Sequence, residues 1–372
     1  MLPGAFSTFR WDCINGAPLD TFLLGAKDEF GDIHKIVACS KANKYLAEDR
    51  IMCLEIIAKE KENFIIHYIP GAKCLTDPPM SLTELIKQRR RWFNGSMFAT
   101  FHVLTSMCRI WKRRNSFVRN LWFMILYFYM IIQTVLSFIL VGLFYGAFSI
   151  FIRKAFDDDD CLNIFKTANF LENLYLVFLL AVLLLSITVD VKYAETGYRI
   201  CSFAMGCFSI LMVVATILYA INVDRLDSSA NYVIIFIGIW LLSYIMPLLL
   251  NVTKLKVEDF IKGVIYCSFL SPTYVNVFTI FAVSNIHDVS WGSRPAVIDP
   301  LTAKVEGKKQ EIYKNYRANF LIVWILINIA TGGGITALSR NGNEDIIFFV
   351  SLGLAVIIGF KIVLALAHSI LS

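Results

Sequence analysis

Apolar residues dominate the chain from about residue 117 onward, in runs separated by short polar gaps. A helix that crosses a bilayer needs roughly 20 consecutive, mainly apolar residues. We therefore predict membrane spans near residues 121–150, 171–191, 203–223, 232–252, 320–338 and 346–367. The run 320–338 contains three consecutive glycines, which a packed membrane helix tolerates. The pattern predicts an α-helical transmembrane bundle of about six spans over residues 117–372.

A further apolar run, residues 260–283, differs because Pro272 lies in its middle, behind Ser268 and Ser271. Proline removes a backbone N–H and disrupts a helix interior. We expect Pro272 to split the run into two pieces, each too short to span. The run is then re-entrant or interfacial, and residues 285–317 form a cytoplasmic loop.

The charges between the runs favour one orientation. Basic residues from Arg109 to Arg119 precede the first run and place that side in the cytoplasm, and four aspartates at 157–160 fall outside. The segment 285–317 is strongly basic, which again favours the cytoplasm. Its cationic residues are Arg294, Lys304, Lys308, Lys309, Lys314 and Arg317.

Residues 1–116 have the composition of a soluble region and are predicted to mix strands and helices. Residues 65–69 look like a short strand, and residues 49–59 have the periodicity of a helix with one apolar face. Ser81 and Glu84 form a capping-box pattern that opens another helix. We therefore expect the α/β remnant of a catalytic domain, incomplete and GT-A-like, with an interfacial helix.

Composition excludes several classes of protein. Hydrophobic residues make up 57% of the chain and charged residues 17%, against about 25% charged in soluble domains. A freely soluble, disordered or collagenous protein is therefore excluded. The net charge of +6 is modest, and we predict no nucleic-acid partner. The 9 cysteines form no C-x-x-C pair and there are 5 histidines, so we predict no metal site within the chain.

The first candidate chemical cluster is Glu48, Asp49 and Arg50, at the start of the helix predicted for residues 49–59. The helix dipole and a basic neighbour can hold such a carboxylate ionised, so that it could accept a proton from a sugar hydroxyl. Acidic residues are also common in the first turns of helices that have no catalytic role. Both interpretations fit the cluster alone.

The second candidate cluster is Gln88, Arg89, Arg90, Arg91 and Trp92. Three guanidinium groups beside an indole can bind a pyrophosphate while the ring stacks on a sugar. A basic juxtamembrane segment that meets anionic lipid, with a tryptophan as interface anchor, has the same composition.

Taken together, the two clusters, about forty residues apart and followed by apolar runs, resemble the C-terminal half of a chitin synthase, a processive, inverting family 2 glycosyltransferase. The resemblance extends through the soluble part and resumes in the basic segment, where Ser290, Trp291 and Gly292 are characteristic of chitin synthases. The matching segments are residues 3–7, 10–11, 46–50, 76–77, 88–92, 94–96 and 285–292.

The resemblance implies that Asp49 is the general base. It would deprotonate the 4-hydroxyl of the terminal sugar, whose oxygen then attacks C1 of UDP-N-acetylglucosamine. Glu48 and Arg50 would orient that base. Gln88, Arg91 and Trp92 would line the acceptor end of the channel and contact the donor diphosphate, with Arg89 and Arg90 in support.

The resemblance also implies two loops. Pro3, Gly4 and Ala5 would separate the active site from the translocation channel, and Trp291 would face the channel's cytoplasmic mouth. This chain departs from relatives after Gly292, where it has Ser293, Arg294 and Pro295 in place of the usual Thr-Lys-Gly continuation.

The family's uridine-binding segment and its metal-binding Asp-x-Asp would lie upstream of Leu2, and residues 1–116 contain no Asp-x-Asp. A divalent cation, Mg²⁺ or Mn²⁺, is expected for the full-length enzyme with ligands outside this chain. We therefore expect the chain alone to be inactive.

The expected partners are UDP-N-acetylglucosamine, the growing chitin chain, the lipid bilayer and a second copy in a homodimer. The expected location is the plasma membrane, with the catalytic part in the cytoplasm. Two alternatives stay open: a catalytically incomplete membrane partner of a full-length synthase, and a transporter with a cytoplasmic cap. A transporter should place ionisable residues inside its spans, whereas here Asp190 and Lys361 lie close to span ends.

Overall fold

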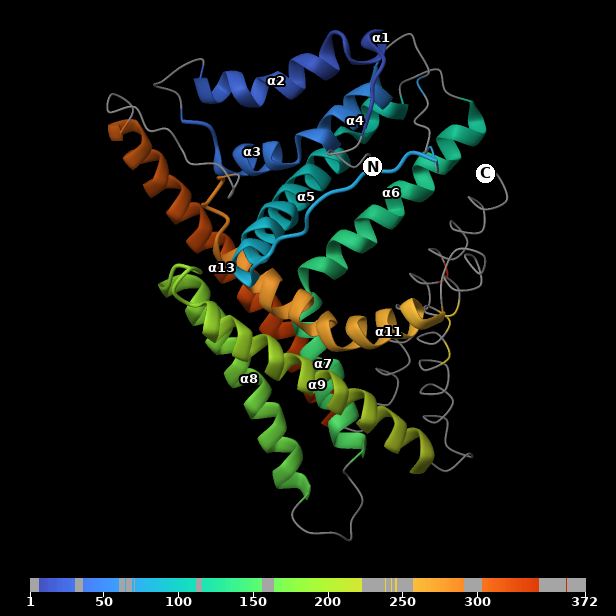
Figure 1. Ribbon diagram of the computed structural model, residues 1–372, viewed down its shortest axis with the longest axis vertical. Helices are drawn as coiled ribbons and strands as arrows, with labels where there is room; N and C mark the ends of the chain where they lie inside the picture. The colour runs from blue at the N-terminus through green and yellow to red at the C-terminus, as the bar shows by residue number, and fades with distance from the viewer. Residues whose placement is uncertain are drawn as a thin grey trace. The chain divides into compact units, whose positions relative to one another are not determined.

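The computed structural model describes residues 7–30, 36–59, 64, 69, 71–111, 116–155, 164–222, 238, 242, 245, 257–290, 303–340 and 359. Within these residues the chain is helical or irregular, and no strand occurs (Figure 1). The α/β character predicted for residues 1–116 is therefore not seen. The predicted strand 65–69 lies outside the described residues except for Ile69, which belongs to no regular element.

The helices follow one another from the N-terminal region to Arg340. Their bounds are α1 Trp11–Ile14, α2 Ala17–Phe30, α3 Cys39–Lys44, the 3₁₀ turn η2 Tyr45–Ala47, α4 Glu48–Ala58, α5 Leu82–Trp111, α6 Phe117–Phe138, α7 Leu140–Ala155, α8 Ile164–Thr188, α9 Glu195–Asn222, α11 Val257–Pro272, the π-helical segment η3 Thr273–Phe278, α12 Thr279–Ser284 and α13 Ala303–Arg340.

The described chain divides into two compact units. One gathers described residues of Met1–Phe138, Leu185–Glu195 and Phe278–Trp324, and the other those of Ile139–Leu184, Thr196–Val277 and Ile325–Ser372. The first unit therefore combines the N-terminal region with two segments that sequence places among the apolar runs.

Helix α5 is the centre of the first unit, where α3, η2, α4 and α6 pack against it (Figure 1). It begins as predicted, since the Ser81 hydroxyl accepts the amide of Glu84 at 3.2 Å. The Glu84 carboxylate reaches back to the amide of Met80, one residue earlier than in an ideal capping box. The predicted helix 49–59 is confirmed by α4.

An ion pair and an apolar cluster join α4 to α5. Arg109 donates two hydrogen bonds of 2.7 Å to the Glu55 carboxylate, which is almost fully buried. Close to this pair, an apolar cluster includes Leu54 and Met107, and Phe123 and Tyr127 of α6 pack on it. These contacts fix the direction of α4 and therefore the place where its first turn stands.

The run predicted as one span over 121–150 is two helices, because α6 ends at Phe138 and α7 begins at Leu140. The two helices belong to different units. Hydropathy stays high across the junction and gives no sign of it. The packing explains the break: α6 is held by the cluster on α5, whereas the amide of Gly142 in α7 donates to the Asn328 side chain of α13 at 2.9 Å.

In the second unit, α7 and α13 pack closely along small residues. A Cβ on Gly142 would lie 2.4 Å from the Asn328 carbonyl oxygen, and one on Gly146 would lie 2.8 Å from Ile335. Small residues permit this close approach of membrane helices. The order of contacts shows that α7 and α13 run in the same direction.

A buried carboxylate, which the apolar pattern of the sequence did not predict, joins three helices of the second unit. Glu172 of α8 accepts hydrogen bonds from Ser149 at 2.5 Å and from Arg153 of α7, and Arg340 of α13 lies 3.4 Å away. Arg153 also donates to Asn169 at 2.6 Å. These pairs place α8 antiparallel to α7 and satisfy a charge that burial alone would make unfavourable.

The expectation that Pro272 splits the run 260–283 is wrong. Helix α11 continues through the π-helical segment η3 into α12. Pro272 cannot bond to the carbonyl of Ser268, four residues earlier, but the Ser209 hydroxyl of α9 donates to that carbonyl at 2.7 Å. A neighbouring helix thus supplies the missing donor and keeps the segment helical.

Five described helical segments are long and apolar enough to cross a membrane: Phe117–Phe138, Thr167–Thr188, Glu195–Tyr219, Val257–Ser284 and Gly307–Arg340. The predicted run 320–338 lies in the last of these, and its glycines do not interrupt the helix. The predicted loop 285–317 is helical from Ala303 onward. The predicted spans 232–252 and 346–367 fall almost entirely outside the described residues.

Candidate functional site

Three faces of helix α5 carry the site, and each makes different contacts. Residues 91, 95 and 99 lie on one face and residues 86, 90, 94 and 98 on a second. Residues 88 and 92 form the far edge of the first face, and residue 89 lies beyond them on a third, as expected from the helical repeat. The first face packs against η2 and α4, and the second against the segment that ends α12 and follows it. The two clusters predicted from sequence meet on the first face.

Gly95 lets the backbone of α5 approach η2. A Cβ built at Gly95 would lie 3.0 Å from the carbonyl carbon of Leu46 and 3.1 Å from the nitrogen of Ala47. One turn further along, Ala99 packs in a buried cluster with Ala47 and Ile51. Small residues therefore set the separation between α5 and the start of α4.

This close approach brings Arg91 beside Glu48 and Asp49 in the first turn of α4. Burial raises the pKa of the Glu48 carboxyl, and the neighbouring Asp49 charge raises it further, whereas Arg91 lowers it. Burial lowers the pKa of the Arg91 guanidinium, which the two carboxylates oppose. Arg50 is half-buried in the same turn. The structure thus joins Glu48, Asp49 and Arg91 in one electrostatic cluster.

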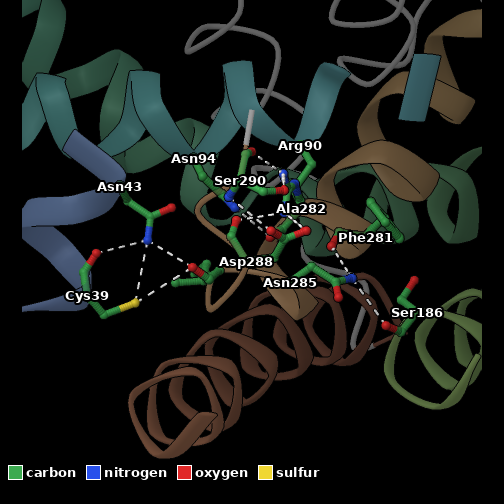
Figure 2. Close-up of polar contacts among 11 residues, drawn as sticks. Cys39, Asn43, Arg90, Asn94, Ser186, Phe281, Ala282, Asn285, Asp288 and Ser290 are labelled. Atoms are coloured by element: carbon green, nitrogen blue, oxygen red, sulfur yellow. Dashed lines mark hydrogen bonds and ion pairs between the residues drawn. The ribbon is translucent and has the colours of Figure 1, made fainter. Parts of the chain in front are cut away.

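The second face of α5 binds backbone carbonyl groups. Arg90 donates to the carbonyl of Asp288 at 2.6 Å and to that of Ser290 at 2.7 Å, and also pairs with the Asp288 carboxylate (Figure 2). One turn later, Asn94 donates to the carbonyl of Ala282 at 2.9 Å. Both side chains are buried. They hold residues 282–290 against α5.

A third anchor for this segment comes from α3. The Asn43 amide donates to the carbonyl of Ile286 at 2.8 Å and to that of Cys39 at 3.0 Å (Figure 2). Burial raises the pKa of the Cys39 thiol to about 12, so this thiol stays protonated and unreactive at neutral pH. The three anchors make residues 282–290 a fixed part of the first unit.

Two further segments meet at this segment and at the start of α5. Asn285 donates to the carbonyl of Ser186, in the last turn of α8, at 3.1 Å (Figure 2). Thr83, in the first turn of α5, donates to the carboxylate of Glu195, the first residue of α9, at 2.9 Å. The α8–α9 connection and the segment after α12 therefore lie with the start of α5, as expected if all three occupy one side of a membrane.

The third face of α5 is the more accessible one. The Arg89 guanidinium stacks over the Trp92 ring at 4.4 Å from its centroid, and Trp92 is 46% exposed. Gln88 is half-buried. A stacked indole with an exposed edge can bind a sugar face, so these residues suit the acceptor role that the family resemblance implies.

His287 lies beside three cations in the segment held by α5. Burial, Arg317, Lys314 and Arg90 together lower the pKa of the His287 imidazole to about 4. The ring is therefore neutral at physiological pH, which suits a half-buried position among positive charges.

Four predicted site residues, Pro3, Gly4, Ala5 and Trp291, lie outside the described residues. Their predicted roles therefore stay predictions. Among the described residues, no group of three or more His, Cys, Asp or Glu could hold a metal ion. Arg91 beside Glu48 and Asp49 would also repel a divalent cation from those carboxylates.

Three side chains anchor residues 282–290, and the sequence suggested a role for one of them, Arg90, as a supporting residue at the substrate site. It suggested none for Asn94 or Asn43. The spacing of Arg90 and Asn94 shows that they share a helix face, and this signal could have revealed them as a pair. Nothing in the local sequence identifies Asn43, whose partner Ile286 lies 243 residues away.

Comparison with known proteins agrees with these observations. Residues 1–107 match the model of the chitin synthase-like glycosyltransferase domain. The chain is 29% identical over 81% of its length to chitin synthase 1 of Saccharomyces cerevisiae, of which it covers 27%. It is 26% identical over 88% of its length to chitin synthase 1 of Phytophthora sojae, and it covers 39% of that protein. It is 30% identical over 80% of its length to chitin synthase 2 of Candida albicans, and it covers 33% of that protein.

The chain spans between about a quarter and a half of the length of the curated relatives it matches. The matched domain covers α1 to most of α5 and therefore includes both clusters. The long apolar helices and these relatives indicate an integral membrane protein. The chain belongs to the chitin synthase-like glycosyltransferases.

Proposed function

We propose that the protein transfers N-acetylglucosamine from UDP-N-acetylglucosamine to the 4-hydroxyl of a growing β-1,4-linked chitin chain and passes the polymer across the membrane. The observation that carries this proposal is the cluster of Glu48, Asp49 and Arg91, which the close approach at Gly95 creates. A carboxylate that can accept a proton and a guanidinium that can bind phosphate are the groups that glycosyl transfer needs.

In the proposed reaction, Asp49 takes the proton of the acceptor 4-hydroxyl. The hydroxyl oxygen forms a bond to C1 of the donor sugar as the bond from C1 to the diphosphate oxygen breaks. UDP leaves with the electron pair of that bond, and the anomeric centre is inverted. Glu48 and Arg50 flank Asp49 and keep the carboxylate oriented.

Residues of α5 receive the substrates. Arg91, beside the Glu48 and Asp49 carboxylates, would stabilise the charge of the donor diphosphate as UDP leaves. Trp92 stacks on the acceptor sugar, with Gln88 beside it. Arg89 supports Trp92 by stacking on its ring at 4.4 Å.

The donor site needs residues beyond the matched segment. We propose that the uridine-binding residues and the ligands of a divalent cation, Mg²⁺ or Mn²⁺, are supplied by a part of the full-length protein outside this chain. The cation would neutralise charge on the diphosphate. On this proposal the chain alone is inactive. The alternative role, as a catalytically incomplete partner of a full-length synthase, would require the same fold.

The location is also a proposal. We place the catalytic part on the cytoplasmic side of the plasma membrane, as the loop charges indicate, with the long apolar helices in lipid and two copies in a homodimer. A cysteine placed at Gln310 should resist a membrane-impermeant thiol reagent applied from outside, in a background without the exposed native cysteines. Efficient labelling would refute this orientation.

The test of the proposed function is Asp49→Asn in the native full-length protein. Polymer formation from labelled UDP-N-acetylglucosamine should fall by about 10²-fold or more, the usual contribution of a general base, while UDP binding persists. Asp20→Asn is the matched control, because Asp20 also lies in the first turn of a helix, α2. Substantial activity in Asp49→Asn would refute the assignment of the base.

A further inference from the structure

The three consecutive arginines of α5 have three different environments. Arg89 stacks on an exposed indole and Arg91 faces two carboxylates, but the Arg90 side chain is 1% exposed. Both terminal nitrogens of Arg90 already bind protein acceptors. A diphosphate could not reach this guanidinium without displacing the segment that it holds.

Two backbone carbonyls of the segment bound by Arg90 are placed to accept hydrogen bonds from the two terminal nitrogens of one guanidinium group. The amide of Asp288 donates to the carbonyl of Asn285 at 3.1 Å, and the amide of Ser290 donates to Oδ1 of Asp288 at 3.0 Å. These two turns direct the carbonyls of Asp288 and Ser290 toward the same guanidinium (Figure 2). The planar fork of arginine spans both carbonyls, whereas the point charge of lysine would not.

The electrostatics of this contact are compatible with a charged Arg90. The carboxylate of Asp288 supplies the countercharge that a buried cation needs. Burial, together with the Arg91 charge, lowers the pKa of Arg90 to about 10, so the group stays charged at neutral pH. One oxygen of the Asp288 carboxylate therefore accepts the Ser290 amide within the segment, and the other pairs with Arg90 of α5.

Arg90 is also the last anchor before a segment with a proposed role. Asn94 and Asn43 fix the carbonyls of Ala282 and Ile286, and Arg90 fixes the carbonyl of Ser290, after which the chain continues into Trp291. The same helix that presents Arg91 to Asp49 thus determines where residues 285–290 end.

We infer that Arg90 is a positioning residue, which binds the turn 285–290 to α5 and takes no part in binding the donor diphosphate. Its importance for polymer synthesis rests on the proposed function, because it acts by fixing one part of the site relative to another. Its contact with the segment does not depend on that function.

The test is amide hydrogen exchange of the native full-length protein, measured on peptides that contain residues 285–290. Arg90→Lys keeps the charge and loses the fork, and Arg90→Gln loses both. Each should speed the exchange of the Asp288 and Ser290 amides by about tenfold or more, since a hydrogen bond to a charged group corresponds to at least that factor. Arg89→Gln, the matched control, should leave this exchange unchanged. Unchanged exchange in both Arg90 variants would overturn the inference.

UDP binding separates positioning from donor contact. Arg90→Lys should bind UDP within about twofold of the wild type, and polymer formation should fall through kcat with little change in the KM for UDP-N-acetylglucosamine. Asp288→Ala weakens the same turn while Arg90 remains, because it removes the countercharge of Arg90 and the acceptor of the Ser290 amide. A loss of UDP affinity in Arg90→Lys that Asp288→Ala does not share would overturn the inference. If the protein makes no polymer at all, the proposed function fails, but the exchange and UDP-binding results still decide the role of Arg90.

Discussion

Adding one methyl group at Gly95 should separate the two clusters of the site. The new Cβ would lie 3.0 Å from the carbonyl carbon of Leu46 and 3.1 Å from the nitrogen of Ala47, both backbone atoms. Relaxed carbon contacts are about 3.5–4.0 Å, so α5 and η2 must move apart by roughly half an ångström. Overpacking of this kind costs about 1–3 kcal/mol, against a gain of about 1 kcal/mol from replacing a helical glycine with alanine.

The same substitution at Gly307 provides the matched control. Gly307 also lies inside a helix, α13, but a Cβ there would have no atom within 4 Å. Gly307→Ala should therefore stabilise the protein by about 0.5–1 kcal/mol. We expect Gly95→Ala to be less stable than Gly307→Ala by about 1–3 kcal/mol. In detergent, the difference should appear as a lower unfolding midpoint, followed by tryptophan fluorescence.

The displacement at Gly95 should also affect chemistry, because Arg91 lies one turn away on the same face of α5. Polymer formation per folded molecule should fall in Gly95→Ala and stay at the wild-type level in Gly307→Ala. If Gly95→Ala were as stable and as active as Gly307→Ala, the close approach of α5 to η2 would not be what sets the site.

Three other perturbations test the packing of each unit. The pKa of His287 is lowered from 6.5 to about 4, so as pH falls the unfolded chain takes up a proton before the folded chain does. The free energy of unfolding should be highest above pH 6.5 and fall by about 1–2 kcal/mol as the pH drops to 4. His287→Gln should lose this dependence when unfolding is measured as a function of pH. Arg109→Leu should lower the free energy of unfolding by about 3 kcal/mol, because it leaves Glu55 buried and unpaired. The double variant with Glu55→Leu should recover most of this loss, as measured by denaturant titration. Ser209→Ala should lower the free energy of unfolding by about 1 kcal/mol when Pro272 is present. In the Pro272→Ala background it should cost almost nothing, because residue 272 then donates its own backbone N–H to Ser268. Equal costs in the two backgrounds of this double-mutant cycle would contradict the explanation of the continuous helix.

Local patterns in the sequence predicted several features of the first unit. The apolar periodicity of residues 49–59 identified α4 to within one residue at each end, and Ser81 identified the start of α5. These succeed because helix periodicity and capping are determined by residues within a turn or two of one another.

The features that the sequence did not reveal depend on contacts between distant segments. The three adjacent arginines look equivalent in sequence. The middle one, Arg90, differs because it bonds to residues 285–290, and its partner Asp288 lies 198 positions away in the chain. In the same way, Pro272 predicts a break that Ser209 of another helix prevents. Glu172 was overlooked because a single carboxylate barely lowers the hydropathy of a long apolar run.

The division of the run 121–150 into α6 and α7 has the same origin. Both helices are apolar on either side of the junction at Ile139, so hydropathy cannot locate it. The junction follows from two different packing surfaces, one on α5 and the other on α13, neither of which is visible in the run itself.

The most direct measurement of the proposed activity uses the native full-length protein in membranes, supplied with radiolabelled UDP-N-acetylglucosamine and a divalent cation. We predict an insoluble labelled polymer that chitinase digests, with no polymer from UDP-glucose under the same conditions. If a folded preparation that binds UDP makes no polymer from UDP-N-acetylglucosamine, or makes one that chitinase does not digest, the protein is not a chitin-forming glycosyltransferase.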